Sequence, residues 1–218
     1  MSYSTLYALN ADVGIEYGEE FKNSWLFAPL LLDALNYKYN RELIESNPSY
    51  MRSFISYASE YTKPLFANMN KNESEDEKFE DMIIWMFTQQ FVFKTSQKEH
   101  VIEVLRNYHK NNEQHFIDSS DKERSETFKK RNEEVVAAIE ALDADKTPFF
   151  VFNNTSVSDL ADDWYWKYNE ESDDSEECLL MDNDDLLLES VIFVDIPEDR
   201  DRRFHDMCTL KFKEYFAQ

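Results

Sequence analysis

Glycine is almost absent from this chain. The 218 residues include two glycines, Gly14 and Gly18, against an average share of about 7% in globular proteins. A phosphate-binding loop or a dinucleotide-binding fingerprint needs several glycines at fixed spacing, because the backbone must approach the ligand closely. The sequence therefore excludes folds built around such loops. Left-handed helix ends must be formed by other residues, chiefly asparagine.

Aromatic residues give the chain enough apolar surface to fold. There are 17 Phe, 12 Tyr and 4 Trp, and 42% of all residues are hydrophobic, whereas disorder requires high charge together with low hydrophobicity. No apolar run is long enough to cross a membrane, and no secretory signal opens the chain. We expect a soluble, cytoplasmic protein with no membrane contact. Its two cysteines, Cys178 and Cys208, lack the spacing of a metal or redox motif, and the sequence leaves a disulfide between them open.

Hydrophobic periodicity predicts helices over most of residues 19–145. The pattern predicts a helix over 19–46 that Pro29 breaks or restarts near Ala28, and a second helix that starts at Asn47-Pro48. Ser74 to Glu77 is a capping box that leads into FEDMIIWMFTQQFVF, which predicts a helix buried on all sides at the centre of the packing. A second capping box, Ser96 to Glu99, precedes another helix, which Asn111-Asn112 should end. A long amphipathic helix should cover 119–144, and residues 1–18 fit either an edge strand or a loose arm.

After Lys146 the pattern favours strands. TPFFVFNN and LLLESVIFVDI are short runs of β-branched and aromatic residues between turn formers, typical of buried strands. Residues 203–216 favour a helix, although TLKFK also alternates like a strand. The predicted fold class is therefore α+β, mostly helical in its N-terminal body with a small C-terminal β-containing unit. The predicted domains are a helical body over 1–145 and an acidic, strand-containing unit over 146–218 that packs on it.

Negative charge is concentrated in residues 158–201, named the acidic segment below. It contains seventeen acidic residues and two basic ones, a net charge of −15 out of −22 for the chain. Large aromatic residues such as Trp164 and Trp166 lie among the acids, and a disordered acidic tail would not need them. We therefore expect part of the segment to be anchored to the fold, with its carboxylates held in place.

Such a charge distribution repels nucleic acid and anionic membranes and favours a basic protein as partner. DNA is bound mainly through lysine and arginine, so carboxylates spaced along a helix followed by a loop would compete for the same surface. The sequence thus predicts a non-enzymatic DNA mimic that blocks a nucleic-acid-binding protein. It shares charge and strategy, not sequence, with phage anti-restriction and anti-CRISPR proteins. The candidate partner-binding residues are Asp159, Asp162, Asp163, Trp164, Trp166, Glu170, Glu171, Asp173, Asp174, Glu176, Glu177, Asp182, Asp184 and Asp185.

Other functions remain open at this level. The acids can serve solubility alone, or the chain can be an immunity protein or antitoxin that neutralises a cationic toxin. A hydrolase or transferase with unfamiliar motifs is a further alternative, although the histidines and serines match no known catalytic pattern. Asp182 opens a sequence like a calcium loop, but Leu187 stands where glycine is required and Phe193 where a bidentate acid is required. The sequence therefore predicts no cofactor, metal site or catalytic residue, and it does not predict the oligomeric state.

Overall fold

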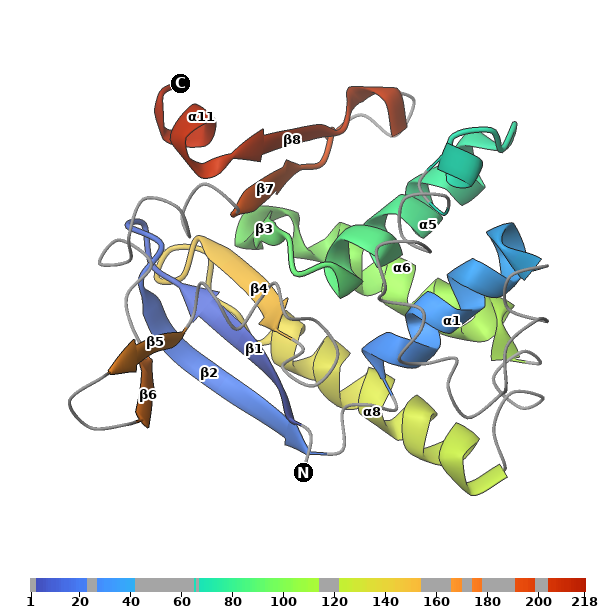
Figure 1. Cartoon of the computed structure of the whole chain (residues 1–218), viewed down its shortest axis with the longest axis horizontal. Helices are drawn as coiled ribbons and strands as arrows, with labels where there is room; N and C mark the ends of the chain where they lie inside the picture. Colours follow the sequence, from blue (N-terminus) through green and yellow to red (C-terminus); the bar gives the residue numbers. More distant parts are fainter. Residues whose placement is uncertain are drawn as a thin grey trace.

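The protein is built on one mixed β-sheet with its longer helices gathered on one side of it, as seen in a computed structural model (Figure 1). The structure describes residues 3–22, 27–41, 65, 67–113, 122–153, 166–169, 174–177, 191–198 and 204–218. The strand order in the sheet is β2-β1-β4-β3-β7-β8. The bounds are β1 Tyr3–Leu9, β2 Ile15–Lys22, β3 Val92–Lys94, β4 Phe149–Asn153, β7 Ile192–Asp195 and β8 Cys208–Lys211. A separate ribbon pairs β5, Trp166–Asn169, with β6, Asp174–Glu177.

The chain begins with strands, so the predicted layout of a helical N-terminal body is wrong. A mixture of helix and strand is present, as an α+β class implies, but β1 and β2 form an antiparallel hairpin in the main sheet. β1 then pairs with β4, from the other end of the sequence. The sheet thus combines strands from both sides of residue 145. The helix predicted to start at residue 19 was also wrong there, because Phe21 of β2 turns its side chain into the core.

Alternation along the strands gives the sheet two buried faces. In β4, Phe150 and Phe152 belong to the apolar cluster beneath the helices, whereas Phe149 and Val151 belong to a second cluster on the opposite face. This division follows from the two-residue period of a strand, which sends successive side chains to opposite sides. β4 is buried at every position, which confirms TPFFVFNN as a central strand.

β7 attaches to the sheet through a parallel pairing with β3, while the other pairs in this sheet are antiparallel. Side chains reinforce this contact. The Gln97 amide donates to Asp195 Oδ1 at 2.8 Å and to the Ile196 carbonyl at 2.6 Å, and it accepts from the Ile196 N–H at 2.9 Å. Lys94 Nζ lies 2.8 Å from Asp195 Oδ2. The strand predicted in LLLESVIFVDI is confirmed at its VIFVD end.

The helical layer packs against the sheet through α5 and α8. α5 contacts β4, α8 contacts β1 and β2, and α1 and α6 each contact α5. None of the helices in the described ranges is long and apolar enough to cross a membrane. The bounds are α1 Ala28–Tyr39, α5 Glu75–Thr88, α6 Lys98–Asn111 and α8 Lys122–Glu140.

Local signals set the helix ends, with one correction. Ser74 caps α5 as predicted, since its side chain accepts from the Glu77 N–H at 3.4 Å. A helix starts near Ala28 as predicted: α1 begins there with Pro29 in its first turn, where the missing N–H has no helical partner to lose. Ser96 caps nothing, because α6 begins at Lys98 after a short 3-10 turn. The helix predicted from Asn47 lies outside the described residues.

The predicted central helix is shorter than its apolar run. α5 ends at Thr88, and Gln90 adopts a left-handed backbone conformation with φ 61°. The chain reverses there, so the last apolar residues, Val92 and Phe93, enter the sheet as β3. A left-handed residue at a helix end stops the helix, and glutamine fills this role because glycine is so scarce.

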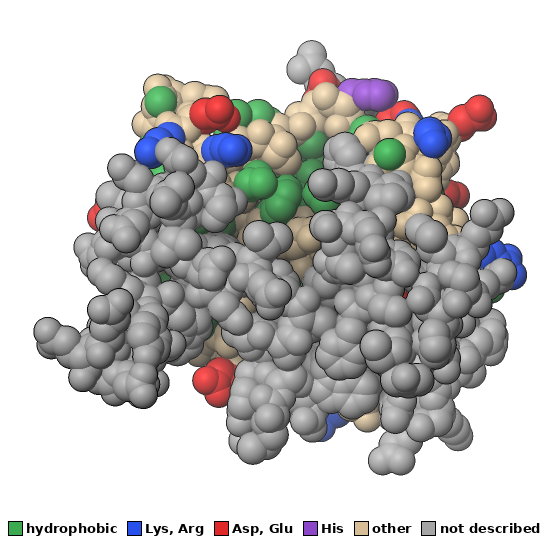
Figure 2. Space-filling model, in the orientation of Figure 1, with side chains coloured by type: hydrophobic (Ala, Val, Ile, Leu, Met, Phe, Trp, Pro, Cys, Tyr) green, Lys and Arg blue, Asp and Glu red, His purple; other side chains and the backbone are tan. Residues whose placement is uncertain are grey.

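The C-terminal segment covers the second face of the sheet. A helix was predicted over 203–216, but the chain forms β8 and then a short helix, α11, Phe212–Phe216. β8 pairs with β7 from Ile192↔Lys211 to Asp195↔Cys208, so the alternation of TLKFK was the correct signal. The Tyr215 ring stacks on Phe193 with 4.3 Å between ring centroids. Figure 2 shows hydrophobic side chains reaching the surface in the region where Figure 1 places β8 and α11.

We predict that Phe152→Ala lowers the free energy of unfolding by about 3–5 kcal/mol, because it leaves a cavity beneath the helices. The Phe152 side chain is 1% exposed, and its ring lies 4.9 Å from Phe87 and 5.5 Å from Phe27 between centroids. The matched control is Phe216→Ala, which truncates a side chain that is 47% exposed and should lose less than about 1 kcal/mol. Urea unfolding followed by tryptophan fluorescence measures both, and equal losses would contradict the core assignment.

Candidate functional site

Most of the predicted partner-binding residues lie outside the described part of the chain. The ribbon of β5 and β6 contains four of the predicted residues: Trp166, Asp174, Glu176 and Glu177. The residues outside the described ranges are Asp159, Asp162, Asp163, Trp164, Glu170, Glu171, Asp173, Asp182, Asp184 and Asp185.

The β5-β6 ribbon brings four candidate residues into one register. Glu177 lies opposite Trp166, Glu176 opposite Lys167, and Asp174 opposite Asn169. A helix followed by a loop was expected here, and in residues 166–169 and 174–177 that expectation was wrong. The antiparallel pairing spaces alternate residues of one strand about 7 Å apart and neighbouring strands about 4.8 Å apart. The ribbon can therefore set acids at regular intervals without a helix.

A buried carboxylate joins two of the helices. Asp81 of α5 is 3% exposed, and its Oδ2 accepts from Lys38 Nζ at 2.7 Å and from the Tyr39 hydroxyl at 2.5 Å. Lys38 also contacts Glu77 at 2.9 Å, and the Asn72 amide donates to the Tyr39 oxygen at 2.9 Å. Lys38 and Tyr39 are the last turn of α1, so this network ties the end of α1 to the middle of α5.

Burial sets the protonation behaviour of this network. It raises the pKa of the Asp81 carboxyl, and the hydrogen bonds from Lys38 and Tyr39 oppose that shift. Burial works to lower the pKa of Lys38, but the hydrogen bond and charge of Asp81 outweigh it and raise that pKa overall. Burial, then the hydrogen bond to Asp81, raises the pKa of Tyr39 to about 12. Lys38 therefore stays charged, and the Lys38–Asp81 contact is an ion pair at neutral pH.

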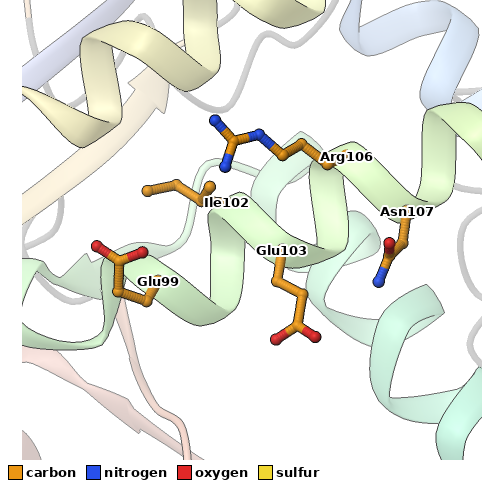
Figure 3. A pocket seen from close by; sticks show the side chains of 5 residues that line it. All are labelled: Glu99, Ile102, Glu103, Arg106 and Asn107. Carbon is orange, nitrogen blue, oxygen red and sulfur yellow. The ribbon is translucent and has the colours of Figure 1, made fainter.

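A shallow pocket of about 330 Å³ lies along the outer face of α6. In Figure 3 its charged side chains diverge, since Arg106 and Glu103 point to opposite sides of the helix. The Arg106 guanidinium forms an ion pair with Glu140 of α8, with 2.6 Å between Nη2 and Oε1. This ion pair links α6 to α8. The arrangement lacks the converging polar groups of a typical active site. Its lining residues are Glu99, Ile102, Glu103, Arg106 and Asn107.

Other titratable groups in the described ranges have structural contacts. The Asp195 carboxylate is bound by Lys94 and Gln97. The Cys208 thiol is exposed and free, and Cys178, the other cysteine, lies outside the described residues. Within the described residues, no three His, Cys, Asp or Glu side chains gather closely enough to hold a metal ion.

Sequence reasoning missed one group of acids. Glu16, Glu19 and Glu20 lie in β2, at one edge of the main sheet. The hydrophobic pattern before residue 19 is weak, and the pattern after it predicted a helix, so these acids were not assigned to a strand. The alternation in IEYGEEFK, with Ile15, Tyr17, Glu19 and Phe21 at every second position, was the signal that could have found the strand.

No protein-family model, curated protein or solved structure matches this chain.

We predict that Lys38→Met lowers the free energy of unfolding by about 1–3 kcal/mol at neutral pH, because Asp81 is left buried without its cation. The expected loss is below that of a fully buried pair, since the Lys38 side chain is 37% exposed. A carboxyl whose pKa is higher in the folded state binds its proton more tightly there. The loss should therefore shrink as the pH falls from neutral to about 4.

Lys71→Met is the matched control for that measurement. Lys71 is exposed and its Nζ donates to Asn68 Oδ1 at 3.1 Å, so its removal should change stability by less than about 0.5 kcal/mol. Urea unfolding at several pH values measures both variants. A difference between wild type and Lys38→Met that stays constant with pH would show that Asp81 is not the titrating group.

Proposed function

We propose that this protein is a non-enzymatic interaction protein that uses its acidic segment to bind and block the basic, nucleic-acid-binding surface of a partner protein. The observation that carries the proposal is the concentration of a net charge of −15 within residues 158–201, out of −22 in all. A folded protein that needed acids only for solubility would gain as much from acids spread over its surface. Placing them in one segment creates a strong local field of one sign.

The β5-β6 ribbon supports this proposal. A DNA duplex presents about one negative charge per 1.7 Å of its axis, and its protein partners meet it mainly with lysine and arginine. A competitor for the same surface must present carboxylates at a similarly regular spacing. It binds more tightly if they are ordered beforehand, because a disordered segment loses conformational entropy on binding. The antiparallel register of Asp174–Glu177 with Trp166–Asn169 provides such a regular backbone within the segment.

The polar groups of the described core support a binding role over catalysis. Asp81 is held by Lys38 and Tyr39, and Asp195 is held by Lys94 and Gln97. These carboxylates are occupied within the fold and are not poised for a substrate. The field of the whole chain also repels polyanionic substrates.

The test compares wild type with two variants of equal net charge. In the first, the acids of the segment are neutralised to Asn or Gln: Asp162, Asp163, Asp173, Asp174, Glu176 and Glu177. In the matched control, exposed acids elsewhere are neutralised in the same way: Glu73, Glu99, Glu113, Glu133, Asp145 and Glu214. Proteins captured from a cell lysate are identified by mass spectrometry at about 50 mM and about 500 mM salt, because exposed charge pairs are screened at high salt.

We expect wild type and the control to capture the same basic protein at low salt and to release it when duplex DNA is added. The neutralised variant should capture at least about tenfold less. Capture that survives neutralisation unchanged would contradict the proposal. Capture of a toxin that nucleic acid does not displace would instead identify an immunity protein.

A further inference from the structure

β2 is the strand at one edge of the main sheet. It hydrogen-bonds with β1 in a register that runs from Tyr3↔Lys22 to Leu9↔Ile15, and no other strand in the described ranges pairs with it. In an antiparallel edge strand, alternate residues direct their N–H and C=O groups away from the sheet. β2 therefore presents a row of donors and acceptors to whatever lies beside it.

The middle of this edge is accessible. Glu16, Gly18 and Glu20 are exposed, and the Tyr17 side chain is 47% exposed. The irregularity in the β1-β2 register falls between Ala8 and Leu9, near the start of β2. The rest of the strand continues without a bulge to Lys22, so an extended segment can align with most of its length.

Three acidic side chains, Glu16, Glu19 and Glu20, lie along the edge. Glu16 accepts from the Asn10 amide at 2.9 Å, and Glu19 accepts from the Tyr17 hydroxyl at 2.7 Å. In the part of the chain that the structure describes, no ion pair engages Glu16, Glu19 or Glu20. The hydrogen bond to Glu19 raises the pKa of Tyr17 to about 12, so that phenol remains a neutral donor. An incoming basic group would therefore meet acidic side chains along this edge.

Gly18 allows close approach at the centre of the strand. It lies opposite Tyr7 of β1, and a Cβ atom added to it would lie 3.1 Å from the Tyr7 ring and 3.2 Å from Thr5 Cγ2. The Tyr7 ring thus occupies the space of the missing side chain on one face. A glycine within a strand often marks a place where another backbone approaches closely.

A second copy of the chain is a poor occupant for this edge. Antiparallel pairing of β2 with β2 would place glutamates of one copy beside those of the other, and both copies carry a net charge of −22. Proteins usually protect an edge with lysine, proline or a bulge, yet β2 has no proline and its single lysine, Lys22, is its last residue. The acids repel an acidic strand and attract a basic one.

We propose that β2 docks an extended, lysine- or arginine-bearing segment of the partner protein, which adds a strand to the sheet beyond β2. Backbone hydrogen bonds hold this strand, and Glu16, Glu19 and Glu20 select its basic residues. The inference rests on the proposed function for the basic character of the partner. It adds a second contact surface, distinct in sequence from the acidic segment.

The test titrates a ¹⁵N-labelled full-length chain with a capped peptide of alternating lysine and threonine, equal in length to β2. We expect chemical-shift changes and slowed hydrogen exchange at the backbone amides of β2. Glu16→Lys combined with Glu20→Lys should weaken binding by about tenfold or more. The matched control, Glu133→Lys combined with Asp145→Lys, makes the same change in net charge at exposed sites on α8 and the following turn, and it should bind like wild type.

A second peptide separates strand addition from simple charge attraction. It has the same sequence, but its alternate backbone amides are N-methylated, which keeps the charge and removes the donors. We expect about a tenfold loss of affinity or more, since added strands bind through main-chain hydrogen bonds. Equal binding of the two peptides, shifts confined to other elements, or dimerisation through β2 would each overturn the inference.

The same titration on the variant neutralised in the acidic segment distinguishes the two proposals. If β2 is a docking edge, that variant still binds the peptide at β2, whatever happens to partner capture. If neutralising the segment abolishes partner capture while the Glu16 and Glu20 reversals leave peptide binding unchanged, the docking edge is refuted and the proposed function stands. If peptide binding at β2 persists and the neutralised variant still captures its partner, the proposed function fails instead.

Discussion

The fold depends on aromatic packing between the central strand and the central helix. Phe152 of β4 stacks on Phe87 of α5, and Phe27 meets both rings edge-on at the start of α1. Phe93 of β3 stacks on Phe150 beside them. These rings are almost completely buried, and together they fix where the helical layer sits on the sheet. A chain with so little glycine has few other ways to bring its elements close, so large side chains fill the space between layers.

Polar contacts complete this frame at two points. The Lys38–Asp81–Tyr39 network joins the end of α1 to α5, and Gln97 with Lys94 holds β7 against β3. Asp81 is buried, so leaving it unpaired would be costly, whereas Asp195 is partly exposed and its contacts mainly fix the position of β7. Both carboxylates therefore contribute to cohesion between elements. The acids for which we propose a role in recognition are those of β2 and of the acidic segment.

The sequence predicted elements well where the signal was local. The cap at Ser74, the stop at Asn111-Asn112 and the buried run of β4 depend on neighbouring residues and were confirmed. The layout was wrong because it depends on pairings between distant segments, such as β1 with β4, which no local pattern reveals. The reversal at Gln90 was also hidden, since glutamine does not signal a left-handed conformation. For the candidate site, the sequence predicted which segment carries the negative charge. Only the pairing of β5 with β6 shows which of the candidate residues lie opposite which neighbours.

The parallel pairing of β3 with β7 has a consequence during translation. β4 ends at Asn153 and β7 begins at Ile192, so a nascent chain can assemble β2, β1, β4 and β3 before the ribosome has made β7. During that interval the outer side of β3 is an open edge, the kind of surface on which unfinished chains associate. The residues synthesised in between, 158–191, contain thirteen acids and one lysine. Two nascent chains at this stage repel each other, so the charge for which we propose a role in recognition also opposes association during assembly.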